Sequence, residues 1–310
     1  MDVIHFPEAQ RPRWRTPVVA LGNFDGVHRG HMKLLERVRR QAGERGGSPV
    51  VVTFDPHPPR VLRPDKAPPL LMTLDQRLEA FDRAGMQAVA IVRFTPELAQ
   101  WHPEVFVDTV LVDWLGAAEV WVGANFLFGR DRAGTYTVLK TLGGDRGFRA
   151  EHIEPVRYKE FVVSSSRIRR LIEEGRVDEA ATPLGHQYFI DGTVVHGDGR
   201  GRALGVATAN LATENELVPG YGVYATLAIL DGLAWPAVTS VGVRPTIGDG
   251  RFTIETHLLD RDTDLYGQRL RVAFIQRLRG EVRFDSLDAL KVQMQDDCRH
   301  AAEMFRQISL

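Results

Sequence analysis

Cysteine is nearly absent from this chain, which has Cys298 alone among its 310 residues. A single thiol excludes an intramolecular disulfide and any zinc site that needs several thiolates. It also fits a reducing compartment, because disulfides persist mainly in oxidising ones. The first residues lack the basic-then-apolar pattern of a secretory signal. We therefore expect the protein to be cytoplasmic.

Long apolar runs and an excess of one charge are lacking as well. No run reaches the roughly 18 apolar residues that a membrane-spanning helix requires. The 39 basic and 40 acidic side chains give a formal net charge of -1, whereas a protein that coats nucleic acid needs a dense basic face. We expect small-molecule partners, no nucleic acid and no membrane. The oligomeric state stays open.

The first half of the chain alternates short apolar runs with helical patterns between Pro17 and about Val156. The run Val50 to Phe54 is continuously apolar except for one threonine, which suits a strand covered on both faces. The helical pattern that starts at His31 has an apolar stripe formed by Leu34, Leu35 and Val38. This βαβ rhythm predicts a parallel sheet with helices on both sides.

A second helix in this half has clear start and stop signals. The letters TLDQ, Thr73 to Gln76, form a capping box, and Gly85 ends the pattern. The predicted buried face of this helix consists of Leu74, Leu78 and Phe81.

From Gln187 onward, short strands follow one another, separated by glycine and proline. This pattern predicts antiparallel strands curled into a small barrel, closed by a C-terminal helix that Ser286 caps. The change of rhythm lies near residues 182 to 187. A chain of this length is expected to form two domains, and we place them at 1–183 and 184–310.

The stretch GNFDGVHRGH, Gly22 to His31, leaves a predicted strand through a glycine-rich turn into a helix. Backbone N–H groups and the positive helix terminus of such a turn can hold an anion. His28 and His31 could both direct ring N–H groups at phosphate oxygens. The glycines could equally be turn formers and the histidines surface residues, and a zinc pair would lack an obvious third ligand. The other candidate phosphate-binding residues of the turn are Gly22, Phe24, Asp25 and Gly26.

Two further stretches could meet the same ligand. TFDPHPPRVL follows the next strand, and its prolines make a stiff loop that carries His57. SSSRIRR, Ser164 to Arg170, places hydroxyl groups at a helix start and sends Arg167 and Arg169 into its first turns. By itself, SSSRIRR could be an ordinary helix cap with solvated arginines.

In the second half, the stretch HGDGRGRALGVATANLAT joins two predicted strands. Its glycines Gly197, Gly199 and Gly201 allow close backbone approach to phosphates, and Arg200 and Arg202 could supply charge. The alternative is a flexible basic loop. Thr208 and Asn210 offer neutral oxygens suited to a magnesium ion, or they are simply turn formers.

The stretch RFTIETHLLD alternates with period two, which puts Phe252, Ile254, Thr256 and Leu258 on one face and Glu255 and His257 on the other. A carboxylate on a barrel strand can be merely solvated. It can also act as a base toward an alcohol, because a hydroxyl group is essentially un-ionised at neutral pH.

The first-half motifs GNFDGVHRGH, TFDPHP, VGANFLFG and SSSRIR resemble the nucleotidyltransferase module of prokaryotic bifunctional riboflavin kinase/FAD synthetases. The resemblance implies a Rossmann-like parallel sheet and FMN adenylyltransferase activity, in which FMN attacks ATP and pyrophosphate leaves. It implies that His28 and His31 stabilise charge on the ATP phosphates. It also implies a second phosphate-binding segment of Ser164, Ser165, Ser166 and Arg169, a substrate contact at Asn125, and a flavin-side loop with Phe54, His57 and Pro58.

The second-half motifs GDGRGRALGVATANL, SVGVRPTIGD, IETHLLD and DLYGQRLRV resemble the riboflavin kinase module of the same family. By that resemblance, Thr208 and Asn210 handle magnesium-ATP, Glu255 is the base for the riboflavin 5′-hydroxyl, and the loop Gly197 to Gly205 covers the nucleotide. The two modules together span about Pro17 to Asp297. The implied protein is a bifunctional enzyme that uses ATP and Mg²⁺ to make FMN from riboflavin and then FAD from FMN.

One departure from the family pattern is Ala207, where the family usually has proline. Proline fixes φ, so alanine is expected to loosen the loop that presents Thr208 and Asn210. We expect the kinase to persist with weaker nucleotide binding. The alternatives are an FMN adenylyltransferase with an impaired kinase and a non-catalytic flavin sensor. A nucleotidyltransferase for another phosphorylated vitamin would leave the kinase-like half unexplained.

Overall fold

The computed structural model describes residues 1–197, 207–243, 252–259, 261 and 263–307. The chain divides into two compact units, unit 1 from Met1 to Ser164 and unit 2 from Ser165 to Leu310. Two helices that precede the barrel therefore pack with unit 2. The domain limits 1–183 and 184–310 describe the expected functional modules and stay a prediction.

Unit 1 is built on a six-stranded sheet with the strand order β1-β4-β3-β2-β5-β6, and all neighbouring strands are parallel. The strands are β1 (Asp2–Phe6), β2 (Val18–Leu21), β3 (Pro49–Asp55), β4 (Ala88–Arg93), β5 (Glu119–Gly123) and β6 (Arg149–Ile153). A small antiparallel pair, β7 (Arg157–Tyr158) and β8 (Phe161–Val162), follows. The predicted parallel sheet is confirmed.

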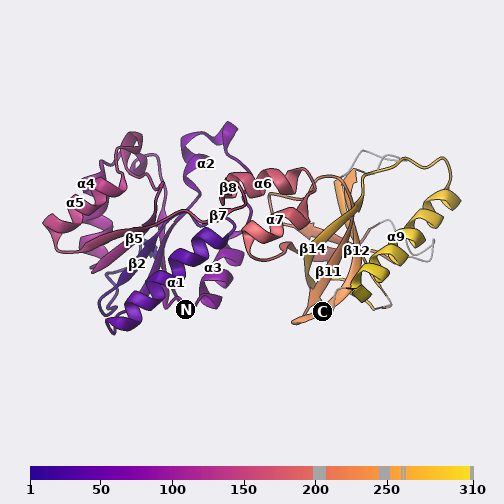
Figure 1. Ribbon diagram of the computed structural model, residues 1–310, viewed down its shortest axis with the longest axis horizontal. Coiled ribbons are helices and arrows are strands. Elements are labelled where there is room, and N and C mark those ends of the chain that lie inside the picture. Colours follow the sequence, from indigo (N-terminus) through magenta and orange to yellow (C-terminus); the bar gives the residue numbers. More distant parts are fainter. Residues whose placement is uncertain (198–206, 244–251, 260, 262, 308–310) are drawn as a thin grey trace. The chain divides into compact units, whose positions relative to one another are not determined.

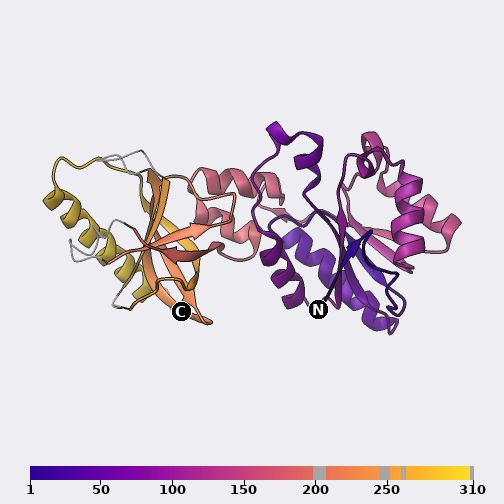
Figure 2. The same ribbon diagram turned by 180° about the vertical axis from the view of Figure 1, so that it is seen from behind.

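Helices cover both faces of this sheet (Figures 1 and 2). The pair α1 and α3 lies on one face, and α4 and α5 lie on the other. The helical segments of unit 1 are α1 (Arg29–Glu44), α2 (Pro58–Leu62), η1 (Pro64–Lys66), α3 (Leu74–Arg83), η2 (Leu98–Gln100), α4 (Pro103–Phe106), the π-helix η3 (Val107–Trp114), η4 (Arg130–Arg132) and α5 (Tyr136–Arg146).

The local signals of α1 and α3 are largely confirmed. Leu34, Leu35 and Val38 are buried on α1, and the Thr73 capping box of α3 forms in both directions. The predicted buried face of α3 is wrong in part, because only Phe81 of its three residues is buried. Gln76 and Arg77 are buried instead, since their polar groups bond to the chain around them.

Unit 2 begins with α6 (Ser165–Glu173) and α7 (Val177–Leu184) and continues into a closed antiparallel barrel with the strand order β10-β13-β12-β11-β14-β9. The strands are β9 (Tyr188–Val195), β10 (Ala209–Thr213), β11 (Gly222–Leu230), β12 (Leu233–Val243), β13 (Phe252–Leu258) and β14 (Arg269–Arg279). The helix α9 (Leu287–Gln307) packs against β12 and β14, and Ser286 Oγ accepts a hydrogen bond from Ala289 N at 3.1 Å. The predicted barrel and the Ser286 cap are confirmed.

Five strands of the fold were not predicted: β1, β6, β7, β8 and β10. β7 and β8 contain only two residues each. β1 and β6 are the outer strands of the parallel sheet, and their residues are buried less continuously than those of the central strands. β10 contains only five residues. Short or half-exposed strands lack the strong apolar signal that identifies a central strand.

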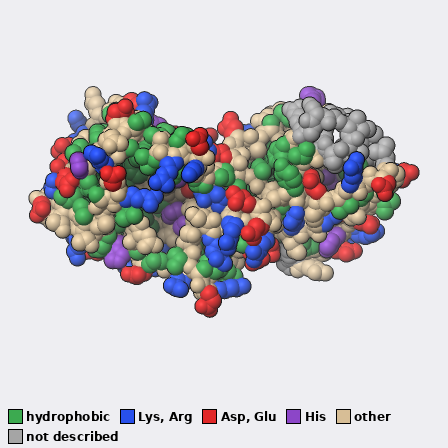
Figure 3. Space-filling view, turned by 90° about the horizontal axis from the view of Figure 1, so that it is seen from above, with side chains coloured by type: hydrophobic (Ala, Val, Ile, Leu, Met, Phe, Trp, Pro, Cys, Tyr) green, Lys and Arg blue, Asp and Glu red, His purple; other side chains and the backbone are tan. Residues whose placement is uncertain are grey.

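Within the described part of the chain, no helix is long and apolar enough to cross a membrane. Acidic and basic side chains are intermixed over the face shown in Figure 3, in line with the near-zero net charge.

Candidate functional site

In unit 1, three loops leave the sheet at the same edge. The strands β3, β2 and β5 are parallel neighbours, so their carboxyl ends lie side by side. The turn after β2 leads to His28, the loop after β3 carries His57, and the turn after β5 carries Asn125. Ligands of open parallel sheets bind at this edge. The sheet therefore brings three of the predicted segments together.

The turn between β2 and α1 has an unusual backbone. Phe24 (φ +54°), Gly26 (φ +83°) and Val27 (φ +37°) all have positive φ. Glycine adopts this region readily, whereas a side chain there costs about 1–2 kcal/mol. Phe24 is held in place by burial, and its ring packs against those of His31 at 5.2 Å and Phe81 at 5.4 Å between centroids.

His28 and His31 form a stacked pair at the start of α1. Their ring centroids are 3.7 Å apart and the planes differ by 11°. His28 is the N-cap, and its Nδ1 accepts a hydrogen bond from His31 N at 3.3 Å. Because Nδ1 accepts, a neutral His28 carries its proton on Nε2, which can donate to a ligand. A Cβ atom at position 30 would lie 3.1 Å from His28 Cε1, so Gly30 leaves room for this ring.

Both imidazoles of the pair are neutral at physiological pH. Burial lowers the pKa of His28 to about 4. Burial, and secondarily the neighbouring His28, hold the pKa of His31 well below its usual range. The buried Nδ1 of His31 has no hydrogen-bond partner among the described residues. The pair is thus a set of uncharged ring nitrogens beside a helix N-terminus, which suits an anionic ligand.

Asp25 has a structural use that the sequence did not reveal. The residue is buried, and its Oδ1 accepts hydrogen bonds from Leu71 N at 2.8 Å and Met72 N at 3.3 Å. These two residues precede α3, so the carboxylate ties the turn to that helix. A direct contact of Asp25 with phosphate stays a prediction, as do those of Gly22 and Phe24.

The predicted flavin-side residues have different environments. Phe54 belongs to the hydrophobic core, where its ring packs edge-on against Phe94 at 5.8 Å. His57 is buried at the start of α2, and Pro58 is the first residue of that helix. Asn125 is exposed in its turn. Their contacts with a flavin stay predictions.

The predicted second phosphate segment includes the point in the sequence at which unit 1 ends and unit 2 begins. Ser164 is the last residue of unit 1, and Ser165 and Ser166 open α6 of unit 2. Arg169 is buried on α6, although the sequence suggested a ligand-facing side chain. Its function as a phosphate ligand stays a prediction.

In unit 2, Glu255 lies in a row of polar residues that crosses three strands. On β13 it pairs with Asn210 of β10 on one side and Ser240 of β12 on the other. Directly opposite residues of antiparallel strands share a face. Ile254, Thr256 and Leu258 are buried on the other face, so the predicted alternation is confirmed for these three residues. Phe252, the first residue of β13, is exposed, because the strand begins there.

The segment that carries Thr208 is attached to β13 by two hydrogen bonds. Thr208 Oγ1 donates to Glu255 Oε2 at 3.1 Å. His257 Nδ1 donates to the carbonyl oxygen of Ala207 at 2.7 Å. His257 was not among the predicted site residues, although it lies two positions after Glu255. These bonds hold the segment that contains Ala207 and Thr208 against β13.

The glycine-rich loop is described only at its first residue. A Cβ atom at Gly197 would clash with the Asn210 side-chain amide, so glycine allows this amide to approach the backbone. Gly199, Gly201 and Arg202 lie outside the described residues.

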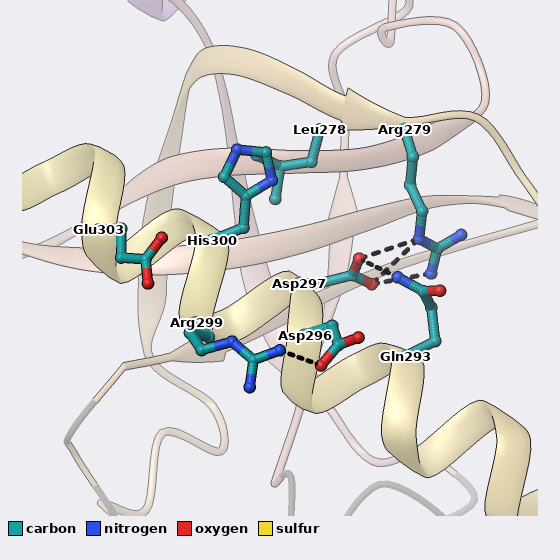
Figure 4. Close-up of a pocket in the computed structure, with 8 residues that line it drawn as sticks. All are labelled: Leu278, Arg279, Gln293, Asp296, Asp297, Arg299, His300 and Glu303. Atoms are coloured by element: carbon teal, nitrogen blue, oxygen red, sulfur yellow. Dashed lines mark hydrogen bonds and ion pairs between the residues drawn. The ribbon is translucent and has the colours of Figure 1, made fainter.

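A further pocket of about 310 Å³ lies between α9 and the end of β14 (Figure 4). Asp297 is buried there and accepts hydrogen bonds from Arg279, with Nη2 at 2.8 Å, and from Gln293. This ion pair fastens α9 to the barrel. The pocket contains none of the residues that the sequence singled out.

The stacked histidines predict that acid destabilises unit 1. The unfolded chain binds more protons than the folded chain between pH 6.5 and about 4, so the free energy of unfolding falls as the pH is lowered through this range. For His28 alone we expect a loss of about 2 kcal/mol between pH 7 and pH 5. Urea unfolding, followed by tryptophan fluorescence, measures it, because four of the five tryptophans lie in unit 1.

The control is a double variant, His28→Gln with His31→Gln, which cannot gain these protons. Its unfolding free energy should depend less on pH than that of the parent. Equal pH dependence of the two proteins would show that the pair is not buried in the neutral form.

Comparison with known proteins agrees with the division into two modules. Residues 10–167 match the family described as FAD synthetase, and residues 184–305 match the family described as riboflavin kinase. A bifunctional riboflavin kinase/FMN adenylyltransferase from Pseudomonas fluorescens is 41% identical over 288 residues, which cover 93% of this chain and 92% of that protein. A protein of the same description from Escherichia coli K12 is 36% identical over 289 residues, with the same coverage.

The fold is also found in a solved structure. A protein from Streptococcus pneumoniae, described as a macrolide-efflux protein, superposes with a TM-score of 0.86 at 28% identity and covers 96% of this chain and 97% of its own. The curated relatives match over nearly their whole length, and both enzyme families are represented in one polypeptide. The chain therefore belongs to the bifunctional riboflavin kinase/FMN adenylyltransferase family.

Proposed function

We propose that the turn Gly22–His31 holds the phosphates of ATP while unit 1 adenylylates FMN. The observation that carries this proposal is the stacked pair of neutral imidazoles at the N-terminus of α1. A negatively charged ligand at this point would be stabilised by the helix N-terminus, by backbone N–H groups and by the ring N–H donors together. The location at the carboxyl edge of β2 also fits a nucleotide site.

The chemistry needs alignment more than it needs a base. An oxygen of the FMN phosphate forms a bond to the α-phosphorus of ATP, and the bond from that phosphorus to the bridging oxygen of pyrophosphate breaks. The attacking phosphate monoester is already mostly ionised at pH 7, because its second pKa is about 6. The protein therefore has to hold the two anions in line and stabilise the charge that develops.

The proposed division of the site follows the three loops. His28 and His31 donate to ATP phosphate oxygens, with the backbone of Gly22, Phe24 and Gly26 around them. Separately from these loops, Ser164, Ser165, Ser166 and Arg169 are proposed as a phosphate-binding segment, as the family resemblance implies. The flavin side consists of Phe54, His57, Pro58 and Asn125. The carboxylate of Asp25 supports the turn through Leu71 and Met72.

For the kinase, we propose that Glu255 accepts the proton of the riboflavin 5′-hydroxyl. The oxygen of that hydroxyl forms a bond to the γ-phosphorus of ATP, and ADP leaves. Unlike the FMN phosphate, the alcohol carries no charge to begin with, so a positioned base helps. The half-buried Glu255 has its Oε2 held by the Thr208 hydroxyl, which restricts its rotamers.

Magnesium fits the donor set of this site. Thr208, Glu255 and Asn210 supply a hydroxyl, a carboxylate and an amide on one face of the barrel, and Mg²⁺ prefers oxygen ligands. We propose that Thr208 and Asn210 hold it together with ATP. Mg²⁺ commonly takes several of its ligands from water and substrate phosphates. When bound, Mg²⁺ would neutralise phosphate charge.

The proposed location of the enzyme is the cytoplasm. The single cysteine, the half-buried Cys298, fits a reducing compartment. The partners implied by the family are the small molecules riboflavin, FMN and ATP.

Replacing His31 with alanine should abolish FAD formation from FMN and ATP. We expect kcat to fall by about 10²–10³-fold, as when a donor to transition-state charge is lost. Chromatography of the flavins measures the product, and FMN formation from riboflavin by the same preparation is the control for intact protein. FAD synthesis close to that of the parent would show that His31 does not contribute to the phosphate site.

Replacing Glu255 with glutamine should suppress FMN formation from riboflavin by about 10²-fold or more, because the amide cannot take the hydroxyl proton. FAD formation from supplied FMN should be unchanged. Flavin chromatography of two parallel reactions, started from riboflavin and from FMN, tests both statements. Equal loss of both reactions would contradict separate sites.

The hydrogen bond between His257 and Ala207 can be tested through the kinase reaction. His257→Ala should raise the KM for ATP in the kinase reaction about three- to tenfold, because the segment before Thr208 loses an anchor. Ala207→Pro should lower the same KM, since proline restricts φ.

In the double variant, His257→Ala with Ala207→Pro, the KM for ATP should be lower than the product of the two single fold-changes predicts. The reason is that both substitutions act on the same segment. Strict additivity would show that His257 does not act through Ala207.

A further inference from the structure

Arg77 is the largest side chain that is fully buried in the described part of the chain. It lies on α3 and is 1% exposed. An arginine is almost never fully buried unless its charge is paired and hydrogen-bonded. The helix pattern predicted a different buried face for α3, so the burial of Arg77 has a cause outside the helix itself.

The guanidinium of Arg77 joins the turn after β2 to the carboxyl end of β3. Its Nη1 donates to the carbonyl oxygen of Asn23 at 3.2 Å and to Thr53 Oγ1 at 3.4 Å. Its Nη2 lies 3.6 Å from Asp55 Oδ1. Asn23 is in the turn that leads to His28, whereas Asp55 is two residues before His57. One side chain therefore contacts the turn that leads to His28 and the strand end from which the His57 loop starts.

The carbonyl of Asn23 is held from two directions. It accepts a hydrogen bond from Thr53 Oγ1 at 3.2 Å as well as the bond from Arg77. These two bonds fix the peptide that precedes Phe24, the residue whose positive φ starts the turn. A backbone conformation of this kind persists only where its surroundings hold it. The Phe24 ring in turn contacts His31.

We propose that Arg77 is a positioning residue for adenylyl transfer, which fixes the turn carrying His28 and His31 against the end of β3, where the loop carrying His57 starts. The proposal rests on the site assignment made above. In-line attack requires both reactants in one geometry, and a displacement of about 1 Å can cost about 10²-fold in rate. Arg77 touches neither reactant in this account. It holds the turn after β2 at a fixed distance from the end of β3.

The test is a kinetic comparison of Arg77→Lys and Arg77→Met in the full chain, with FMN and ATP as substrates. We expect kcat to fall about tenfold for lysine, which keeps the charge but not the fork of donors, and about 10²-fold for methionine. The KM for either substrate should change less than threefold, because each loop keeps its own contacts. A purely structural role would not separate kcat from KM in this way.

The matched control is Arg83→Met at the end of the same helix, where the side chain is 70% exposed. It should leave kcat unchanged, and all variants should keep riboflavin kinase activity. A kcat of Arg77→Met within twofold of the parent, or a change in KM alone, would overturn the proposal.

Folding is checked by near-ultraviolet circular dichroism. If Arg77→Met loses its tertiary signal, the test uses Arg77→Lys and Thr53→Val instead. A lowered kcat at constant KM supports the proposal. A kcat equal to that of the parent in both variants overturns it. The His31→Ala assay tests the site assignment separately. Full FAD synthesis by that variant would show that the phosphates bind elsewhere, independently of the result for Arg77.

Discussion

The parallel pairing of β2 with β3 and β5 is the constraint on which the site in unit 1 depends. It sends three loops out of one edge of the sheet, and it starts α1 immediately after one of them. The N-terminus of that helix then supplies unsatisfied N–H groups where an anionic ligand would lie. The position of His28 as the N-cap follows from this arrangement.

The two units solve different chemical problems with different scaffolds. A phosphate nucleophile is already charged and has to be aligned with a second anion, which suits neutral donors at the edge of a rigid sheet. An alcohol has to lose its proton, which suits a carboxylate. One face of β13 presents Glu255 beside Asn210, while the buried side chains of its other face pack into the barrel core.

Buried polar groups around the first site show how such a turn is held in place. Asp25 and Arg77 are both nearly inaccessible, and each bonds to backbone groups of another loop. Burying a charge is costly unless it is paired and hydrogen-bonded. These contacts are therefore specific, and they stabilise a backbone in which Phe24 has a positive φ.

The sequence by itself determined the parallel sheet, the barrel, the caps at Thr73 and Ser286, and the spacing of His28 and His31, because periodicity, capping and turn signals are local. It did not reveal the edge strand β1, the stacking of the two imidazoles, or the burial of Arg77 on a helix whose apolar stripe pointed to other residues. Only the tertiary structure decided these features. Burial and hydrogen bonding of a polar side chain depend on residues distant in the chain, such as Asn23 and Thr53 for Arg77.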